Sequence, residues 1–429
     1  MDYRILPPSE LPEAEITLPL SKSMSNRALI INALSGLDSS SLEVADCDDT
    51  RLLSAALASE SDEIDIDGAG TAMRFLTAYF AVRQGRTVTL TGNDRMRHRP
   101  IGPLVDALRR LGAQIEYMGE EGFPPLKITG TALSGGEISI DASKSSQYVS
   151  ALMMIAPYLA GGLKITLAGE TGSMPYIYLT HSMMLSAGAK ADIYRSTITV
   201  EQSPYTRAIT EVEADWSAAS YWYELEAVSS GFLTLMGLRA DSRQGDAAVA
   251  RIFADLGVNT EFNPDYNGQV AAAELTASPD FSPRLTIDLS DNPDLTPAIA
   301  VTCALIGIPF RLTGLDTLRI KECDRFEAIS RELAKLGVVV DEPAPGVMEW
   351  LGRRNPLQAL PEFDTYGDHR MAMAFAPVAI YIPGIKIRDA EVVSKSYPGF
   401  WSDLQSAGFN LVDGDASPEQ LFDAQEETE

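Results

Sequence analysis

The sequence predicts an α/β protein in which one helix–strand–helix–strand unit is repeated six times and divided between two domains. Three observations lead to this prediction. One complete unit is visible between residues 67 and 117, and glycines that close strands and helices recur in step along the chain. In addition, 429 residues are too many for one ordinary hydrophobic core, so six units divide naturally into two domains of three.

The complete unit gives the pattern from which the other elements are inferred. In chain order we expect a turn at 68–70, a helix from Thr71 stopped by Gly85, a strand at 87–91, a basic loop at 95–99, a helix that begins near Pro100 and ends at Arg110, and a strand at 114–117. Pro100 and Pro103 suit the first turn of the second helix, and Gly112 stands where helices often end in a left-handed residue.

Two series of glycines indicate that this unit is repeated. The first series closes strands at intervals of 77, 68 and 77 residues: Gly92, Gly169, Gly237 and Gly314. The second series closes helices at intervals of 76, 69, 80 and 71 residues: Gly112, Gly188, Gly257, Gly337 and Gly408. Glycine ends helices in many proteins, which explains each position but not two series that keep in step. We therefore expect true internal repetition.

Six helix openings mark the six units: near Ser23, Thr71, Ser146, Trp216, Leu295 and Asp368. They place the first domain at 21–214 and the second at 1–20 plus 215–429. Within the second domain, residues 4–19 have the loose alternation of an edge strand, and an acidic tail begins at about residue 413.

The composition predicts a soluble globular protein, because 45% of the residues are apolar and charges of both signs are mixed. The N-terminus lacks the pattern of a signal peptide, and the longest apolar run, 298–310, is too short to span a membrane. Cys47, Cys303 and Cys323 stand in unrelated contexts, and the three histidines lack metal-ligand spacing. We therefore expect a cytoplasmic protein with reduced thiols and no disulfide framework or zinc site.

The net charge of −26 argues against nucleic acid as a partner, because binding to a phosphate backbone needs a broad basic surface. An anionic ligand must therefore meet positive charge that is concentrated locally.

The first candidate anion site is the segment Ser21-Lys-Ser-Met-Ser-Asn-Arg27, which opens an apolar helix. Lys22, Ser23 and Arg27 lie where free backbone amides and the helix dipole favour an anion. The alternative is that the serines only cap the helix and the cations face solvent.

Other helix starts repeat this arrangement with different chemistry. Gly70 offers bare backbone amides, and a hydroxyl-rich start combines two serines with an amide: Ser145, Ser146 and Gln147. Asp294 precedes an apolar helix, where it is either a functional carboxylate or an ordinary N-cap. The charged triplet Asp368-His-Arg370 opens a helix that is apolar enough to be buried. By contrast, the opening at Trp216 carries no cation, and we interpret it as structural.

Two further clusters carry cations. Lys321 and Arg325 are spaced one helical turn apart, so both can face one site, although charged helix starts are often only solvated surfaces. Lys395 lies in a Lys-Ser-Tyr-Pro segment after an expected strand and is a weak candidate by itself.

Seven motifs follow one another along almost the whole chain: Ser-Lys-Ser-x-Ser-Asn-Arg, Ala-Gly-Thr-Ala-Met-Arg, Arg-Met-x-x-Arg-Pro-Ile, Ser-Ser-Gln, Arg-x-Lys-Glu-x-Asp-Arg, Asp-His-Arg-Met-Ala-Met and Lys-Ser-Tyr-Pro. This ordered set resembles the 5-enolpyruvylshikimate-3-phosphate synthases. The resemblance implies two domains, each of three βαβαββ units around a pseudo-threefold axis, with helix N-termini directed at the cleft between them. It implies a monomer that transfers the enolpyruvyl group of phosphoenolpyruvate to the 5-hydroxyl of shikimate 3-phosphate, on the route to chorismate, with no metal or cofactor.

The resemblance also implies roles for individual residues. Those implied for shikimate 3-phosphate are Lys22, Ser23, Arg27, Ser145, Ser146, Gln147, Ser173, Tyr176, Asp294 and Lys321. Those implied for phosphoenolpyruvate are Lys22, Gly70, Arg99, Gln147, Arg325, Arg370 and Lys395. Asp294 would remove the hydroxyl proton, and Glu322 or Lys22 would supply the proton of the methylene carbon.

The sequence departs from the family's pattern at four positions: Gly68 replaces an expected Asn, Phe75 a Pro, Met174 a frequent Lys, and Thr317 a usual Asn. The first repeat also looks shorter than in the family. Two alternatives stay open at this point. One is UDP-N-acetylglucosamine enolpyruvyl transferase, which has the same fold but uses a loop cysteine that residues 93–100 lack. The other is an anion-binding protein without catalytic activity.

Overall fold

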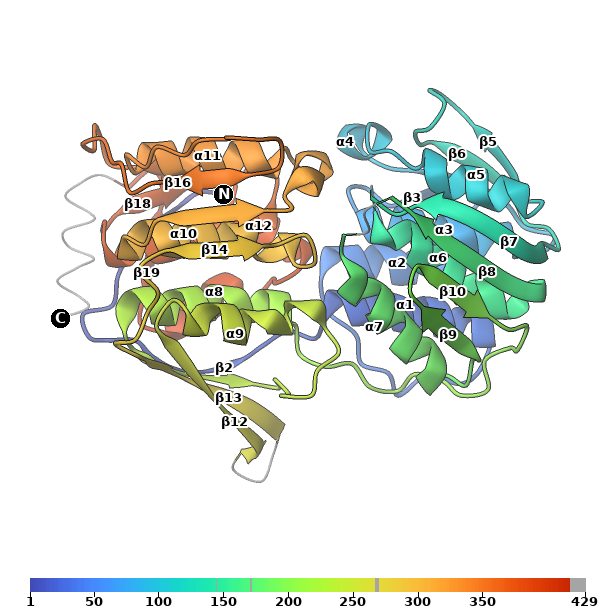
Figure 1. Cartoon of the computed structure of the whole chain (residues 1–429), viewed down its shortest axis with the longest axis horizontal. Helices are drawn as coiled ribbons and strands as arrows, with labels where there is room; N and C mark the ends of the chain where they lie inside the picture. Colours follow the sequence, from blue (N-terminus) through green and yellow to red (C-terminus); the bar gives the residue numbers. More distant parts are fainter. Residues whose placement is uncertain (144, 170–171, 267–269, 417–429) are drawn as a thin grey trace. The chain divides into compact units, whose positions relative to one another are not determined.

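The structure is a computed structural model that describes residues 1–143, 145–169, 172–266 and 270–416 (Figure 1). Most of the predicted acidic tail therefore lies outside the described residues. The chain divides into two compact units. We call them the N-terminal unit, which comprises Leu20–Val212 and Arg243–Gly245, and the C-terminal unit, which comprises Met1–Pro19, Glu213–Ser242 and Asp246–Glu429. Residues 243–245 thus group with the N-terminal unit, whereas the sequence placed them in the second domain.

The N-terminal unit contains two copies of one six-element βαβαββ repeat. The first copy consists of β3 (Glu63–Asp65), α3 (Gly70–Ala81), β4 (Thr87–Thr91), α5 (Gly102–Arg110), β5 (Gln114–Tyr117) and β6 (Leu126–Thr129), with a short extra helix α4 (Asp94–Arg97). Its strands form a sheet in the order β3-β4-β6-β5, in which β3 and β4 are parallel and the other pairs antiparallel.

The second copy has the same topology. It consists of β7 (Ser134–Asp141), α6 (Ser146–Ile155) with the 3₁₀ helix η1 (Ala156–Tyr158), β8 (Ala160–Ala168), α7 (Met174–Ser186), β9 (Ala191–Tyr194) and β10 (Thr197–Val200). Its sheet order is β7-β8-β10-β9, again with one parallel pair at the edge. The repeat inferred from the glycine series is therefore a unit of structure.

The C-terminal unit contains three further sheets, and the N-terminal segment of the chain supplies a strand to two of them. The third copy consists of β2 (Glu13–Thr17), α8 (Trp216–Ser229), β11 (Phe232–Met236), η2 (Gly245–Ala247), α9 (Ala248–Ala254), β12 (Val258–Tyr266) and β13 (Val270–Ala277), with sheet order β12-β13-β11-β2. Strand β2 pairs in parallel with β11, more than two hundred residues later in the chain.

The last two copies follow the same plan with shorter strands. The fourth consists of β14 (Leu285–Asp288), η3 (Pro293–Leu295), α10 (Thr296–Ile306), β15 (Phe310–Thr313), η4 (Asp316–Ile320), α11 (Arg325–Lys335) and β16 (Met348–Trp350). The fifth consists of β17 (Glu362–Phe363), α12 (His369–Phe375), η5 (Ala376–Ile380), β18 (Ile385–Ile387), η6 (Ala390–Lys395), α13 (Phe400–Ser406) and β19 (Asn410–Asp413), and it is completed by β1 (Tyr3–Leu6). Their sheet orders are β14-β15-β16 and β17-β18-β1-β19.

The sixth repeat comes before these five copies in the chain and is the short one, as the sequence indicated. It consists of α1 (Lys22–Ser35) and α2 (Asp48–Ala58), and residues 36–47 between them contain no strand.

Each unit is built around three apolar helices that contact one another. In the N-terminal unit these inner helices are α1, α3 and α6, and the outer helices α2, α5 and α7 each pack between two of them. Helix α3 is buried at every position except Thr71, and α6 at every position except Gln147. A helix that is apolar on all sides is stable in water only when other elements cover it, which explains its central position.

The inner helices of the C-terminal unit are α8, α10 and α12, which also contact one another pairwise (Figure 1). Helix α10 carries Pro297 in its first turn, is buried from Thr296 to Ala304, and ends at Gly307, whose φ of 81° is left-handed. Helix α12 is buried along its whole length. The six predicted helix openings are therefore confirmed, each within one residue of the observed helix start.

Two local predictions were wrong. The basic loop expected at 95–99 begins as helix α4, because the side chain of Asn93 accepts a hydrogen bond from the amide of Met96 at 2.9 Å and caps a helical turn. The single edge strand expected at 4–19 is two strands. Strand β2 lies at a sheet edge, but β1 lies inside its sheet between β18 and β19.

Within the described part of the chain, no helix has the length and apolar character needed to cross a membrane.

One carboxyl group is buried within the apolar core of the C-terminal unit. Glu224 lies in the middle of α8 with no solvent exposure, and among the described residues neither of its carboxyl oxygens has a hydrogen-bond partner. Burial therefore raises the pKa of Glu224 well above its usual value, so the side chain is neutral in the folded protein.

This burial makes a prediction about stability and pH. A carboxyl that stays protonated in the folded state but ionises in the unfolded chain lowers the stability of the fold as the pH rises above its unfolded pKa of 4.5. We expect Glu224→Gln to remove this dependence. Relative to the variant, the wild-type protein should lose about 1.4 kcal/mol of unfolding free energy per pH unit between that value and the raised pKa of the folded state. Urea unfolding of both proteins at several pH values measures the difference, and a difference that is constant with pH would contradict the assignment.

Candidate active site

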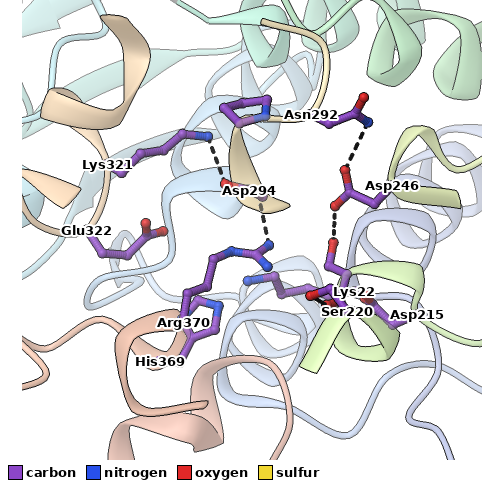
Figure 2. A network of polar contacts seen from close by, with 12 residues as sticks. Lys22, Asp215, Ser220, Asp246, Asn292, Asp294, Lys321, Glu322, His369 and Arg370 are labelled. Atoms are coloured by element: carbon purple, nitrogen blue, oxygen red, sulfur yellow. Dashed lines mark hydrogen bonds and ion pairs between the residues drawn. The ribbon is translucent and has the colours of Figure 1, made fainter. Parts of the chain in front are cut away.

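In the C-terminal unit, predicted site residues meet around the carboxylate of Asp294 (Figure 2). Arg325 Nη1 donates to Asp294 Oδ1 at 2.8 Å, and Lys321 Nζ lies 3.2 Å from the same oxygen. Arg370 Nη2 donates to Asp294 Oδ2 at 2.9 Å. Three cations, two from residues 321–325 and one from the start of α12, therefore hold one carboxylate.

The electrostatic consequence for Asp294 is strong. Burial alone would raise the pKa of its carboxyl, but the charges of Arg370, Lys321 and Arg325 outweigh burial and hold the pKa well below its usual range. Asp294 does not cap α10, because it lies within the 3₁₀ helix η3 and the residue at the cap of α10 is Leu295. The interpretation of Asp294 as an ordinary N-cap is therefore wrong.

Arg325 connects this carboxylate to two others. Its side chain is 1% exposed, and its Nε, Nη1 and Nη2 atoms donate to Asp368, Asp294 and Glu322, each at 2.8 Å. Burial alone would lower the pKa of Arg325, but the three carboxylates raise it, so the side chain remains charged. A guanidinium has five N–H groups, and these three bonds leave two for a further anion.

Lys321 and Arg325 do face one carboxylate, but not for the reason that the sequence suggested. They are not one turn apart on a helix, because Lys321 follows η4 with extended backbone and α11 begins only at Arg325. The side chain of Asp324 accepts the amide hydrogen of Glu327 and thereby fixes where α11 begins.

The loop before α12 positions two further cations of this unit, Arg370 and Lys395. Asp368 caps the helix by accepting the amide hydrogen of Arg370 at 3.0 Å, while its other oxygen binds Arg325. Lys395 Nζ donates to the carbonyl oxygen of Gly367 at 2.7 Å. The loop is thus held from both sides.

Sequence reasoning missed a further acid beside this cluster, Asp246. Its carboxylate accepts hydrogen bonds from Ser217 at the start of α8 and, at 3.3 Å, from Asn292 before α10 (Figure 2). Burial raises the pKa of Asp246, and the charge of Asp294 raises it further. No motif marks this residue, because its partners lie 29 and 46 residues away in the sequence.

In the N-terminal unit, the start of α1 carries the first predicted cluster. Ser21, rather than Ser23, is the capping residue, since its Oγ accepts the amide hydrogen of Met24. Lys22 Nζ lies 3.1 Å from Asp49 Oδ2, and both side chains are largely buried. Asp49 is a second acid that sequence reasoning missed, because nothing in the sequence ties α2 to the start of α1.

Arg27 is a buried cation whose hydrogen-bond partners are all neutral. Its guanidinium donates to Thr180 Oγ1 at 2.7 Å, to the Ser23 carbonyl at 2.8 Å, to the Tyr176 carbonyl at 3.3 Å and to Ser150 Oγ at 3.4 Å. Within the described part of the chain it forms no ion pair with a carboxylate, and burial lowers its pKa to about 10. It remains charged at neutral pH and is suited to an anionic ligand.

Gly70, the first residue of α3, lies directly against Arg99. A Cβ atom at position 70 would come within 2.6 Å of Arg99 Nη1. The chain that carries Arg99 is fixed by its neighbour Pro100, whose carbonyl oxygen accepts hydrogen bonds from Arg74 at 3.0 Å and from Tyr148 at 2.5 Å. The glycine therefore leaves room for this guanidinium.

The hydroxyl-rich start of α6 is also placed as predicted. Ser145 caps the helix by accepting the amide hydrogen of Gln147, and Gln147 Nε2 donates to Thr71 Oγ1 of α3 at 3.1 Å. Two inner helices thus join at their N-terminal ends. Ser173, before α7, has a left-handed φ of 60°, which is unusual for a residue other than glycine.

No group of three or more His, Cys, Asp or Glu side chains in the described ranges is arranged to hold a metal ion.

Comparison with solved structures shows that EPSP synthases have the same α/β fold. The chain is similar to EPSP synthase from Acinetobacter baumannii, with a TM-score of 0.73 and 20% sequence identity over 96% of this chain and all of that chain. At that identity the likeness shows the fold.

Sequence comparison identifies the family within this class. The profile of EPSP synthase (3-phosphoshikimate 1-carboxyvinyltransferase) matches residues 54–404. A 3-phosphoshikimate 1-carboxyvinyltransferase of Bacteroides fragilis (strain YCH46) is 48% identical over 417 residues, which cover 97% of this chain and 100% of that protein. One from Methanospirillum hungatei JF-1 is 34% identical and covers 92% of this chain and 96% of that protein. The chain belongs to the EPSP synthase family, and its members are transferases.

The carboxylate cluster around Arg325 predicts a large effect on stability. Arg325→Met leaves three mostly buried carboxylates without their shared cation and should destabilise the fold by about 3–5 kcal/mol. Arg319→Met is a matched control, because Arg319 also pairs with two carboxylates, Asp324 and Glu342, but at an exposed position. It should cost less than about 1 kcal/mol. Urea unfolding measures both, and equal losses would show that Arg325 has no special structural role.

Proposed function

We propose that this protein transfers the enolpyruvyl group of phosphoenolpyruvate to the 5-hydroxyl of shikimate 3-phosphate and releases inorganic phosphate. The hydroxyl oxygen adds to C2 of phosphoenolpyruvate while a proton adds to its methylene carbon. The resulting tetrahedral adduct then loses phosphate from C2 and a proton from the new methyl group, which restores the double bond. Neither step requires a change of oxidation state.

The number of cations supports this reaction. The two substrates carry two phosphates and two carboxylates, so their binding needs several positive charges at fixed positions. The C-terminal unit contributes Lys321, Arg325, Arg370 and Lys395, and the N-terminal unit contributes Lys22, Arg27 and Arg99. Hydroxyl and amide groups at Ser23, Ser145, Ser146, Gln147, Ser173 and Tyr176 complete the proposed contacts to shikimate 3-phosphate. In this proposal Gly70 lets phosphoenolpyruvate approach the backbone.

The observation that carries the proposal is the position of Asp294, a carboxylate among three cations that does not cap its helix. In the free protein these cations suppress its basicity. When an anionic substrate recruits Arg370 and Lys321, less positive charge acts on Asp294 and the pKa of its carboxyl rises. The same anions that must be bound therefore make the carboxylate a better base for the hydroxyl proton.

Two residues are candidates for the proton donor to the methylene carbon. Lys22 carries an ammonium group 3.1 Å from Asp49, and Glu322 has a carboxyl group that accepts a hydrogen bond from Arg325. A neighbour of opposite charge fixes the position of each group. The ammonium of Lys22 already carries a proton, whereas Glu322 can act as the acid only when its carboxyl group is protonated.

The direct test is phosphate release. We expect inorganic phosphate only when phosphoenolpyruvate and shikimate 3-phosphate are both present. Replacing shikimate 3-phosphate by UDP-N-acetylglucosamine should give none, because the matching family and the relatives described above are 3-phosphoshikimate 1-carboxyvinyltransferases. Binding of both substrates without phosphate release would instead indicate an anion-binding protein without catalytic activity.

Asp294→Asn tests the proposed base. The amide keeps the shape of the side chain but cannot take up a proton, so turnover should fall by roughly 10²-fold to 10⁴-fold while shikimate 3-phosphate still binds. Steady-state rates, calorimetric binding and thermal melting on this one variant separate catalysis from folding. If turnover falls by less than about tenfold, Asp294 is not the base.

Gly70→Ala tests the proposed phosphoenolpyruvate site. The added methyl group displaces the end of the flexible Arg99 side chain, so the fold should survive. The KM for phosphoenolpyruvate should rise by about tenfold or more, the worth of one charge-assisted hydrogen bond, and the KM for shikimate 3-phosphate should change much less. Gly102→Ala at the start of α5 is the control, since a Cβ atom there meets its nearest neighbour at 3.5 Å. Equal increases in both KM values would mean that Gly70 has only a structural role in the turn before α3.

A further inference from the structure

The ring of Phe75, which lies against Arg27, is a feature that the proposed function does not use. The guanidinium carbon of Arg27 lies 5.4 Å from the ring centroid of Phe75 and 5.9 Å from that of Tyr176. Phe75 is on α3, 1% exposed, whereas Arg27 is on α1. The ring and the cation therefore belong to two inner helices of the same unit.

A buried cation needs compensation, and here the compensation is unusual. The hydrogen-bond acceptors of Arg27 are two backbone carbonyls and two hydroxyls, none of which carries a charge. The face of an aromatic ring has a negative electrostatic potential that attracts a cation within about 6 Å of its centroid. Phe75 thus supplies part of the negative potential that a carboxylate would otherwise supply.

A ring has an advantage over a carboxylate at this position. A carboxylate would pair with Arg27 and compete with an anionic ligand for the N–H groups of Arg27. An aromatic ring instead contacts the flat face of the guanidinium, whereas the N–H groups point outward in the plane of the guanidinium. Four of the five N–H groups of Arg27 already donate to neutral acceptors, and the ring can hold the guanidinium in place without taking up the remaining one on Nη1.

We propose that Phe75 is a positioning residue that holds Arg27 in the orientation in which it binds an acidic group of shikimate 3-phosphate. This inference rests on the proposed function and extends it to a core residue that lies against the binding cation. Without the ring, Arg27 spends part of its time in other orientations, and the apparent affinity falls in proportion to the fraction that remains competent to bind.

The test changes the electrostatics of the ring and keeps its shape. Phe75 is replaced by 4-fluoro-, 3,5-difluoro- and pentafluorophenylalanine, which progressively remove negative potential from the ring face. Calorimetry measures the Kd for shikimate 3-phosphate alone. We expect the Kd to rise stepwise, by about 5-fold to 30-fold at the last member, the range for loss of one desolvated cation–π contact. The kcat and the KM for phosphoenolpyruvate should stay within about twofold, because Phe75 does not touch the reacting atoms.

Phe80 provides a matched control on the same helix. It is 4% exposed and packs against Tyr79, so the same fluorinated residues at position 80 change the ring without changing a contact to Arg27. The Kd for shikimate 3-phosphate should be constant in that series, and Phe75→Leu and Phe80→Leu should lower the melting temperature by similar amounts.

The outcomes distinguish this inference from the function on which it rests. If the unmodified protein binds shikimate 3-phosphate and fluorination at position 75 leaves the Kd unchanged, Phe75 only fills space and the inference is wrong. A rise in Kd that is equal at positions 75 and 80 also overturns it. Failure of the unmodified protein to bind shikimate 3-phosphate would overturn the proposed function together with this inference.

Discussion

A helix that is apolar on every side must be covered on every side, and this requirement shapes both units of the protein. Helix α10 is buried from Thr296 to Ala304, and α3 is buried at every position except one. Neighbouring helices and sheets cover their sides, but the first backbone amides of a helix have no partner within the helix. Polar and charged side chains gather at these starts, so the helices that build the core also place the candidate active-site groups.

Positive charge at the helix starts explains how a protein with a large net negative charge can bind anionic substrates. The net charge of −26 belongs to the whole chain, its acidic tail included, whereas the cations of the site are held individually. Arg325 is held by three carboxylates, and Arg27 by neutral acceptors and aromatic rings. These two arrangements have different consequences. Carboxylates keep Arg325 charged and fixed, while the neutral surroundings of Arg27 leave its charge to be balanced by a ligand.

The sequence predicted the structural features that depend only on neighbouring residues, such as the ends of strands. Strands 87–91 and 114–117 match β4 and β5 residue for residue, because glycines lie close to their ends. It did not predict contacts between distant segments. Strand β1 lies inside a sheet because it pairs with β18 and β19, about 380 to 410 residues later. Asp49 and Asp246 were missed for the same reason, and the cation pair of Lys321 and Arg325 was found although the helix assumed for it begins later.

We propose that the cations around Asp294 suppress its basicity until anionic substrates bind. The pKa of this carboxyl can be followed by carbon NMR of protein labelled at aspartate, with Asp294→Asn used to assign the signal. The account predicts a pKa well below the usual range in the free protein and a rise of about one unit or more when shikimate 3-phosphate and a phosphoenolpyruvate analogue are bound. An ordinary pKa in the free protein, or one that the ligands leave unchanged, would contradict it.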